Sequence, residues 1–250
     1  MKRPIYSRLL IPIILFVAIG GGAFAQNPEK TWDYPIKPGS KEWLSQPEFI
    51  GKLTLLNIPS NTLKLLTTNQ LVKVCLDYPY FSLVFTRNSL QQGYEFIRDN
   101  FNGFRELENR PDASQYLLVE YEKMDPSDFK PESSLGTKGE YMAKFTFIEL
   151  LLAQFPILDN TDLSMKNQIL NVGFQKYKKK LLIPSYGLVG LSTTAFVLGR
   201  TINSIDANSP NLNEEEIFKI QNFLNYCSAE NVEFYNNVII KQTESYIQNE

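Results

Sequence analysis

Hydrophobic side chains recur at helical spacing along most of this chain. Leu71, Val74 and Tyr78 lie at i, i+3 and i+7, which predicts one buried face of a helix. The segment 138–155 is apolar almost all round, and 187–205 carries a second strongly apolar run, as helices in a protein interior do. Alternation typical of strands is scarce. The pattern therefore predicts an all-α protein, a multi-helical bundle or short α/α solenoid of about eight to ten helices.

The segment 26–39 breaks this pattern. It contains three prolines, and a proline holds itself and the residue before it out of regular helix. We expect an extended N-terminal arm whose Trp32 and Tyr34 anchor on the helical body. Ser40 suits the N-cap of a short helix that carries Trp43.

One loop stands out within the helical region. Residues 125–136 include two X-Pro steps and a pair of serines, which favour irregular structure. We expect a single helical domain over 26–250, in which this loop can join two halves, 40–124 and 137–250. The last segment, 211–250, predicts either one long helix or a helical hairpin.

The N-terminus reads as an export signal. Three cations precede the apolar segment 9–19, and the small-x-small sequence 23–25 lies directly before Gln26. The alternative is an uncleaved membrane anchor, but the segment is short for a span, which needs about 20 apolar residues. The three glycines at 20–22 favour cleavage over anchoring. We therefore expect a signal peptide over 1–25, no membrane span after cleavage, and an exported protein that is periplasmic or secreted.

The amino-acid composition excludes several classes of active site and of binding partner. The chain has no histidine, which excludes Ser-His-Asp and Cys-His catalysis and histidine-based zinc sites. We find no glycine-rich phosphate loop and no metal-ligand pattern, so we expect no cofactor and no metal. Removal of 1–25 would change the formal net charge from −2 to −5, because this segment carries three positive charges and no negative one. An acidic chain lacks the basic surface that nucleic acid requires, so we expect no nucleic-acid partner.

The two cysteines, Cys75 and Cys227, allow two interpretations. In an exported protein they could form a disulfide that closes a long loop. Each also lies on an apolar helical stripe, where cysteine is commonly a buried free thiol. The sequence favours neither, because it does not give the distance between them.

Glu149 is the strongest candidate for chemistry. It lies among hydrophobic residues of the segment 138–155, where burial would raise the pKa of its carboxyl group unless a cation compensates. Arg200 lies in a similar apolar run, and Arg105 follows Phe104. Glu149 could be a general acid or a ligand-binding carboxylate with an arginine nearby. The interpretation we favour is a buried Glu–Arg pair with a structural role.

Aromatic and cationic side chains supply the candidates for binding. Trp32, Tyr34 and Trp43 could line a sugar or peptide groove, and Arg105 and Arg200 could bind an acidic group. Aromatic residues at helical spacing are more often core than ligand contacts, so the exposure of the two tryptophans is the first discriminating observation.

Three segments carry a resemblance to known proteins. They are the arm sequence Thr-Trp-Asp-Tyr-Pro-Ile-Lys-Pro-Gly at 31–39, Phe-Asn-Gly-Phe-Arg-Glu-Leu at 101–107, and Lys-Phe-Thr-Phe-Ile-Glu-Leu-Leu-Leu-Ala-Gln at 144–154. Together with the helix end at 75–79, they resemble a family of uncharacterised secreted helical proteins from Bacteroidetes. The resemblance implies export from a Gram-negative cell. It implies no activity and carries over no functional residues.

These observations favour an exported, non-enzymatic helical protein that binds a protein, peptide or glycan. The alternative is a carboxylate-dependent hydrolase of glycans in which Glu149 is the general acid. A third possibility is a carrier whose apolar helices enclose a lipid-like ligand. A carboxylate that opens into a cleft would favour the hydrolase, and a sealed ion pair would argue against it.

Overall fold

The computed structural model describes residues 32–128, 133–205, 212–228 and 232–250. The described residues belong to one compact unit, Thr31–Glu250. They contain thirteen α-helices, two 3-10 helices and no strand, which confirms the all-α prediction. The predicted signal peptide, 1–25, lies outside the described residues.

The number of helices exceeds the predicted eight to ten because several are very short. Four of them have five or six residues: α1 (Lys41–Ser45), α2 (Phe49–Thr54), α3 (Ser60–Leu65) and α9 (Phe155–Asp159). A single turn of this length shows almost no hydrophobic periodicity, so the sequence does not reveal it. Ser40 caps α1 as expected, since its hydroxyl accepts a hydrogen bond from the backbone N–H of Trp43.

The described part of the arm, 32–39, is not helical. It is held to the helical body by Tyr34, which is buried and donates a 2.9 Å hydrogen bond to the carbonyl of Val74. Trp43 is also buried, and its ring stacks on that of Tyr80 with 5.1 Å between the centroids. Both aromatic residues therefore belong to the hydrophobic core.

The next elements surround a cluster of aromatic rings that includes Tyr78, Phe101 and Phe104. In chain order they are α4 (Thr68–Leu76), η1 (Phe81–Thr86), α5 (Leu90–Asn100), α6 (Asn102–Glu108) and α7 (Ala113–Lys123). Gly93 of α5 packs against η1 so closely that a β-carbon there would lie 2.0 Å from the carbonyl oxygen of Val84. The contact between α5 and η1 therefore depends on this glycine.

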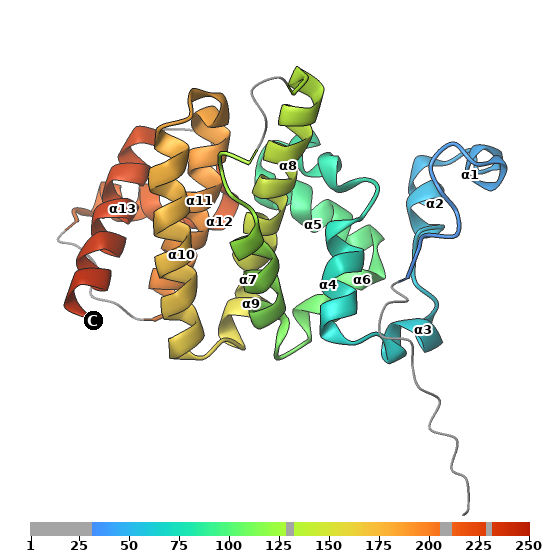
Figure 1. Cartoon of the computed structure of the whole chain (residues 1–250), viewed down its shortest axis with the longest axis horizontal. Coiled ribbons are helices and arrows are strands. Elements are labelled where there is room, and N and C mark those ends of the chain that lie inside the picture. Colours follow the sequence, from blue (N-terminus) through green and yellow to red (C-terminus); the bar gives the residue numbers. More distant parts are fainter. Residues whose placement is uncertain (1–31, 129–132, 206–211, 229–231) are drawn as a thin grey trace, which may run out of the picture. The chain divides into compact units, whose positions relative to one another are not determined.

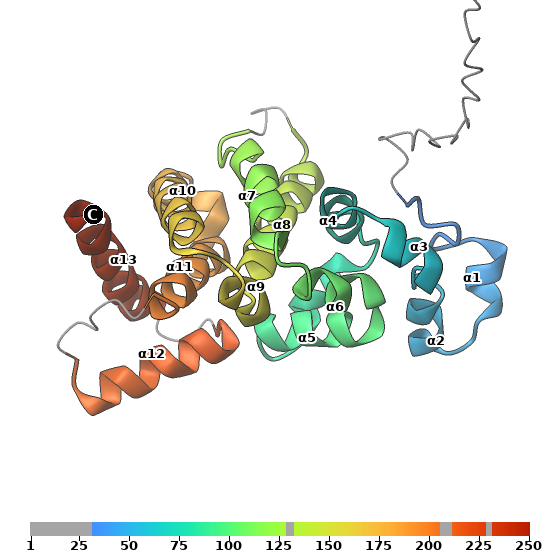
Figure 2. The same ribbon diagram turned by 90° about the horizontal axis from the view of Figure 1, so that it is seen from below.

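The remaining elements are built around two long apolar helices, α8 and α11 (Figure 1). They are α8 (Leu135–Leu152), α9, α10 (Leu163–Leu181), η2 (Pro184–Tyr186), α11 (Gly187–Asn203), α12 (Glu214–Tyr226) and α13 (Val232–Asn249). α11 packs against α8, α10, α12 and α13, which is why it is apolar on every side (Figures 1 and 2). α7 packs against α8, so the segments on either side of loop 125–136 share a core.

The C-terminal segment contains two helices, α12 and α13, and not one long helix. α12 ends where Cys227 takes the left-handed backbone conformation, with φ of 50°. A left-handed residue is a common way to end a helix, although glycine is the usual residue there. Because glycine, the usual signal for such a helix end, is absent here, the sequence did not distinguish one long helix from two helices.

None of the described helices is by itself both long and apolar enough to cross a membrane. The pair Leu163–Leu181 and Pro184–Asn203 would satisfy the length and composition criteria if joined, but it bends by 104° between its two parts.

Candidate functional site

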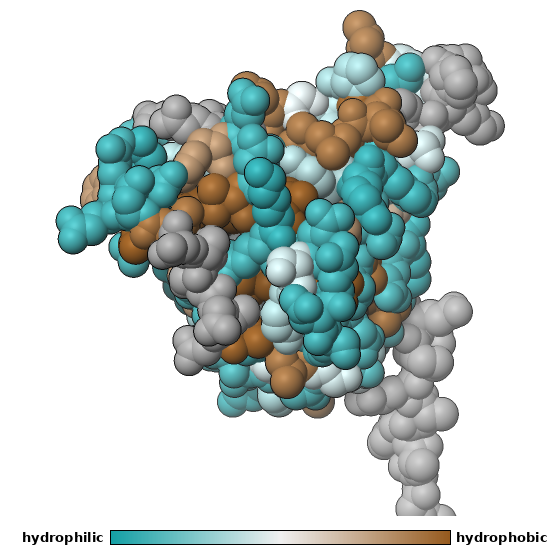
Figure 3. All heavy atoms as spheres, turned by 90° about the vertical axis from the view of Figure 1, so that its left-hand side faces the viewer, coloured by the Kyte–Doolittle hydropathy of each residue, from teal (hydrophilic) through white to brown (hydrophobic). Residues whose placement is uncertain are grey.

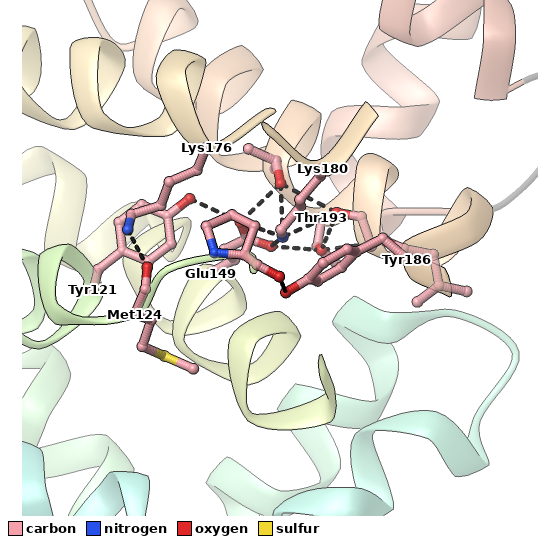
Figure 4. A network of polar contacts seen from close by, with 11 residues as sticks. Tyr121, Met124, Glu149, Lys176, Lys180, Tyr186 and Thr193 are labelled. Atoms are coloured by element: carbon pink, nitrogen blue, oxygen red, sulfur yellow. Dashed lines mark hydrogen bonds and ion pairs between the residues drawn. The ribbon is translucent and has the colours of Figure 1, made fainter. Parts of the chain in front are cut away.

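Glu149 lies at the centre of a buried polar network between α7, α8, α10 and α11 (Figure 4). Its partner is Lys180, whose Nζ lies 2.8 Å from Oε1 and 2.9 Å from Oε2 of the carboxylate. Both side chains are completely buried. The pair therefore joins α8 to the last turn of α10.

Three hydroxyl groups complete the hydrogen bonding of the carboxylate. Tyr121 and Thr194 each donate to Oε1 at 2.8 Å, and Thr193 donates to Oε2 at 2.7 Å. Lys180 Nζ also donates to the carbonyl of Gly190 at 3.1 Å. Because every strong donor and acceptor of the pair has a partner, its burial is compensated.

The surroundings shift the pKa values of the partners. Burial lowers the pKa of Lys180, and the adjacent carboxylate of Glu149 opposes this shift. Burial and the same carboxylate raise the pKa of Tyr121 well above its ordinary value, so its hydroxyl remains a hydrogen-bond donor. The network is therefore suited to hold charge in a fixed arrangement.

Lys176, one turn before Lys180, extends the network toward the loop after α7. Its Nζ donates to the backbone carbonyl of Met124 and lies 4.8 Å from the centre of the Tyr121 ring. Burial lowers its pKa to about 8. Tyr186 donates a 2.9 Å hydrogen bond to the carbonyl of Pro126 in the same loop (Figure 4). The hydrogen bonds of Lys176 and Tyr186 therefore connect the beginning of loop 125–136 to α10 and η2.

The geometry corrects the expected partner of Glu149. We predicted an arginine, and the structure has Lys180 instead. The carboxylate has no surface exposed to solvent and accepts from lysine and hydroxyl groups at once. A general acid must reach a substrate atom within hydrogen-bond distance, and this group has no exposed surface from which to do so.

Arg200 has a different role from the one predicted. It is buried on α11, and burial lowers the pKa of its guanidinium group to about 10. It donates to the backbone carbonyls of Leu224 (2.7 Å), Ala153 (3.0 Å) and Asn225 (3.4 Å), which lie at the ends of α12 and α8. Arg200 thus satisfies carbonyls that helix ends leave without partners.

Arg105 lies on the exposed side of α6 and donates at 3.2 Å to the backbone carbonyl of Asp99. The structure therefore does not bring Arg105, Arg200 and Glu149 into one site. Each makes its hydrogen bonds with a separate set of residues.

Of the three aromatic candidates, Trp32 retains an exposed surface, while Tyr34 and Trp43 are buried. Trp32 lies at the edge of a groove of about 490 Å³ between the arm and the end of α4. The groove is lined by Trp32, Asp33, Tyr34, Lys37, Pro38, Val74, Asp77 and Pro79. The indole Nε1 of Trp32 is buried and has no hydrogen-bond partner among the described residues. Because this nitrogen has no exposed surface, Trp32 offers the groove only the exposed part of its side chain.

Cys75 and Cys227 are both buried and free in the structure. Cys75 lies in α4, whereas Cys227 ends α12. Burial raises the pKa of both thiols, so each is held in its protonated, unreactive form. In the structure, therefore, the two cysteines are free thiols and do not form a disulfide.

Within the described ranges, no group of three or more cysteine, aspartate or glutamate residues could hold a metal ion. The groove beside Trp32 contributes two carboxylates, Asp33 and Asp77, and Asp33 forms an ion pair of 3.1 Å with Lys37.

Neither Lys176 nor Lys180 was singled out from the sequence. A signal was nevertheless present. Ile169, Gly173, Lys176 and Lys180 are spaced four, three and four apart, and all lie on the buried face of α10. A buried lysine on an apolar stripe calls for a buried partner, and Glu149 is the buried acidic residue of the apolar helix α8.

Comparisons with known proteins add no relative: no family model, no curated protein and no solved structure matches this chain.

Proposed function

We propose that this is an exported, non-enzymatic helical protein that binds a glycan in the groove between the arm and α4. The observation that carries the proposal is Trp32, whose partly exposed side chain lines the groove beside Asp33, Lys37 and Asp77. Export rests on the predicted signal peptide, 1–25, and on the resemblance to secreted proteins from Bacteroidetes.

The chemistry of the groove favours a sugar over an apolar ligand. Lys37 is a donor, Asp33 and Asp77 are acceptors, and the Trp32 ring adds an apolar surface. Sugar hydroxyls both donate and accept hydrogen bonds, and sugar rings pack on aromatic rings. The volume of about 490 Å³ is in the range of small-ligand sites.

The hydrolase alternative has less support. It relied on Glu149 as an exposed acid, whereas Glu149 is buried and paired with Lys180. The lipid-carrier alternative also lacks a specific observation in its favour, because the apolar helices α8 and α11 pack directly against each other. We therefore retain the binding function.

Fluorescence of the two tryptophans tests the proposal. Trp43→Phe leaves Trp32 as the reporter in the groove, and Trp32→Phe leaves the buried Trp43. We expect a panel of envelope and dietary oligosaccharides to include one that changes the fluorescence of the Trp43→Phe variant. The same sugar should leave the Trp32→Phe variant unchanged.

Calorimetry with matched aspartate variants locates the site. Asp77→Asn should weaken binding of that sugar by about tenfold, the effect of losing a charged hydrogen bond, while the exposed Asp159→Asn should not. Absence of any fluorescence or heat change across the panel would refute glycan binding. Binding of peptides in place of sugars would also refute it, and release of free sugar would instead support the hydrolase.

Export is tested separately by expression in a Gram-negative host. We expect the protein in the periplasm or medium, with Gln26 as the first residue by N-terminal sequencing. A full-length protein retained in the cytoplasm would exclude this part of the proposal without affecting the groove.

A further inference from the structure

Lys176 is a buried lysine that forms no ion pair with any of the described residues. The carboxylates nearest to it already have other partners. Asp125 forms an ion pair with Lys179. Glu149 forms one with Lys180. An ammonium group buried without its own counter-charge destabilises a folded protein, so this position is costly for a side chain with a structural role alone.

Uncharged groups surround the nitrogen of this lysine. Its Nζ donates to the backbone carbonyl of Met124 (Figure 4) and, at 3.4 Å, to that of Glu122. It lies 4.8 Å from the centre of the Tyr121 ring and 5.5 Å from that of the Phe145 ring. A neutral amine has two N–H bonds, one for each carbonyl, and a lone pair that neither bond uses. These contacts therefore suit the neutral amine as well as the ammonium group.

Burial favours the neutral form of Lys176. It lowers the pKa of Lys176 to about 8, although the carboxylates of Asp125 and Glu149 oppose this shift. The ammonium groups of Lys179 and Lys180 lower the pKa further. At pH 7 about a tenth of the side chain is then neutral, compared with fewer than about one in a thousand for a lysine in water. Desolvation and adjacent cationic groups are the two conditions that make lysine a nucleophile in proteins.

A cavity of about 340 Å³ gives access to this side chain. Besides Lys176, it is lined by Glu122, Asp125, Asn171, Val172, Gln175 and Lys179. The two carboxylates and two ammonium groups of this lining carry no net charge together, which favours a neutral ligand. The amides of Asn171 and Gln175 both donate and accept hydrogen bonds, as the hydroxyl groups of a ligand do. The volume is at the lower end of the range for small-ligand sites.

We infer that this cavity takes up a small hydroxylated aldehyde, such as the open-chain form of a short sugar, which Lys176 binds covalently as an imine. Nζ of the neutral amine attacks the carbonyl carbon, so that a C–N bond forms and an electron pair of the C=O bond moves onto the oxygen. Both hydrogens of the amine then leave with this oxygen as water, and a C=N double bond remains. The reaction needs no oxidant or reductant.

Exposed lysines supply the comparison. The side of the unit seen in Figure 3 is largely hydrophilic below the hydrophobic side chains gathered at its top. Lys178 lies two residues after Lys176 on the same helix, α10, but is exposed to solvent and does not line the cavity. It is therefore the matched reference for the reactivity of Lys176.

Reductive trapping tests the inference. The purified protein is incubated at about pH 7 with glyceraldehyde and cyanoborohydride, which reduces an imine to a stable secondary amine, and peptide mapping by mass spectrometry gives the rate at each lysine. We expect Lys176 to be modified at least about tenfold faster than Lys178. The α-amino group, whose pKa in peptides is about 8, shows the rate of an accessible amine of similar basicity.

A second aldehyde and matched variants test the contribution of the cavity. Propanal has the same number of carbon atoms and no hydroxyl group, so it should modify Lys176 about fivefold more slowly than glyceraldehyde does, relative to Lys178. Gln175→Leu should slow the reaction of Lys176 with glyceraldehyde by about the same factor. Gln168→Leu is the control, because Gln168 is also exposed on α10 but does not line the cavity. Circular dichroism verifies that both variants are folded.

Modification of Lys176 that is no faster than that of Lys178 overturns the inference. Equal rates with propanal and glyceraldehyde overturn it too, as do equal effects of the two glutamine substitutions. In urea the preference for Lys176 should vanish, because burial and the cavity are lost on unfolding, and a preference that persists there also contradicts the inference. None of these outcomes bears on the sugar groove between the arm and α4, which is lined by other residues.

Discussion

Lys180 Nζ lies 2.8 Å and 2.9 Å from the two carboxylate oxygens of Glu149, and neither side chain has any surface in contact with solvent. A buried ion pair of this kind adds little net stability relative to a well-packed apolar pair, because both charges lose their hydration. Loss of one partner is different, since the other charge then remains buried without compensation.

Glu149→Gln should therefore destabilise the protein by about 3–5 kcal/mol, because it leaves the ammonium group of Lys180 without its counter-charge. Chemical denaturation measures this change. Glu140→Gln is the matched control, as Glu140 forms an exposed ion pair with Lys144 on the same helix, and it should cost less than about 1 kcal/mol. Similar effects of the two substitutions would contradict the role of the buried pair.

Lys176 should make stability depend on pH between 8 and 10.5. Burial lowers its pKa from 10.5 to about 8, so in this range the unfolded chain binds more protons than the folded one. The contribution of Lys176 to the free energy of unfolding must therefore increase with pH in this range.

Buried tyrosines with raised pKa values lower the stability of the folded protein above about pH 10. The contribution of Lys176 is therefore measured as a difference in stability between two proteins that share these tyrosines. The free energy of unfolding of the unmodified protein, minus that of Lys176→Met, should increase from about pH 7 to 10. A difference that stays constant over this range would exclude a perturbed Lys176.

Arg200→Leu should destabilise the protein by about 3 kcal/mol or more. The substitution leaves the carbonyls of Ala153, Leu224 and Asn225 without the guanidinium donors that they now have, in a place that water reaches poorly. Arg105→Leu, on the exposed side of α6, should change stability by less than about 0.5 kcal/mol. Thermal unfolding of both variants provides the comparison.

Two glycine-to-alanine substitutions should have opposite effects. A β-carbon at Gly93 would lie 2.0 Å from the carbonyl oxygen of Val84, so Gly93→Ala must separate α5 from η1 and should cost at least about 2 kcal/mol. Nothing lies within 4 Å of a β-carbon at Gly139, inside α8. Gly139→Ala should stabilise by about 0.5–1 kcal/mol. If neither substitution changes the denaturation midpoint, the close packing of α5 on η1 is wrong.

Thiol titration should find two free cysteines. Cys75 and Cys227 are buried, so a thiol reagent should react slowly with the folded protein. After unfolding in the absence of a reductant, two thiols should react at once. Fewer than two would mean that a disulfide forms, contrary to the structure.

The sequence predicted most of the fold because long amphipathic helices have a periodic signature. The spacing of Leu71, Val74 and Tyr78 predicted one buried helical face; Leu71 and Val74 are buried in α4, and Tyr78 is buried just after it. Short helices such as α2 and α9 were missed, since five or six residues contain too few turns for a period to emerge.

The candidate site was only half predictable. Glu149 was recognised because a carboxylate on an all-apolar helix must be compensated, and this holds for any fold. The identity of its partner depends on which helix packs beside α8 and in which register, which a single sequence does not specify. Lys180 and Arg200 were both available, and helix packing brought the lysine to the carboxylate and the arginine to the helix ends.

The hydrogen bond from Tyr121 to Glu149 has a consequence for how the chain assembles. Tyr121 precedes loop 125–136, whereas Glu149, Lys180 and Thr193 follow it. Neither half of the chain can therefore satisfy the carboxylate completely without the other. A chain cut within the loop should yield two fragments that are unstable separately and regain structure when mixed. The buried pair thus couples the two halves into one cooperative folding unit, and the correct alignment of four helices becomes a condition for reaching the native state.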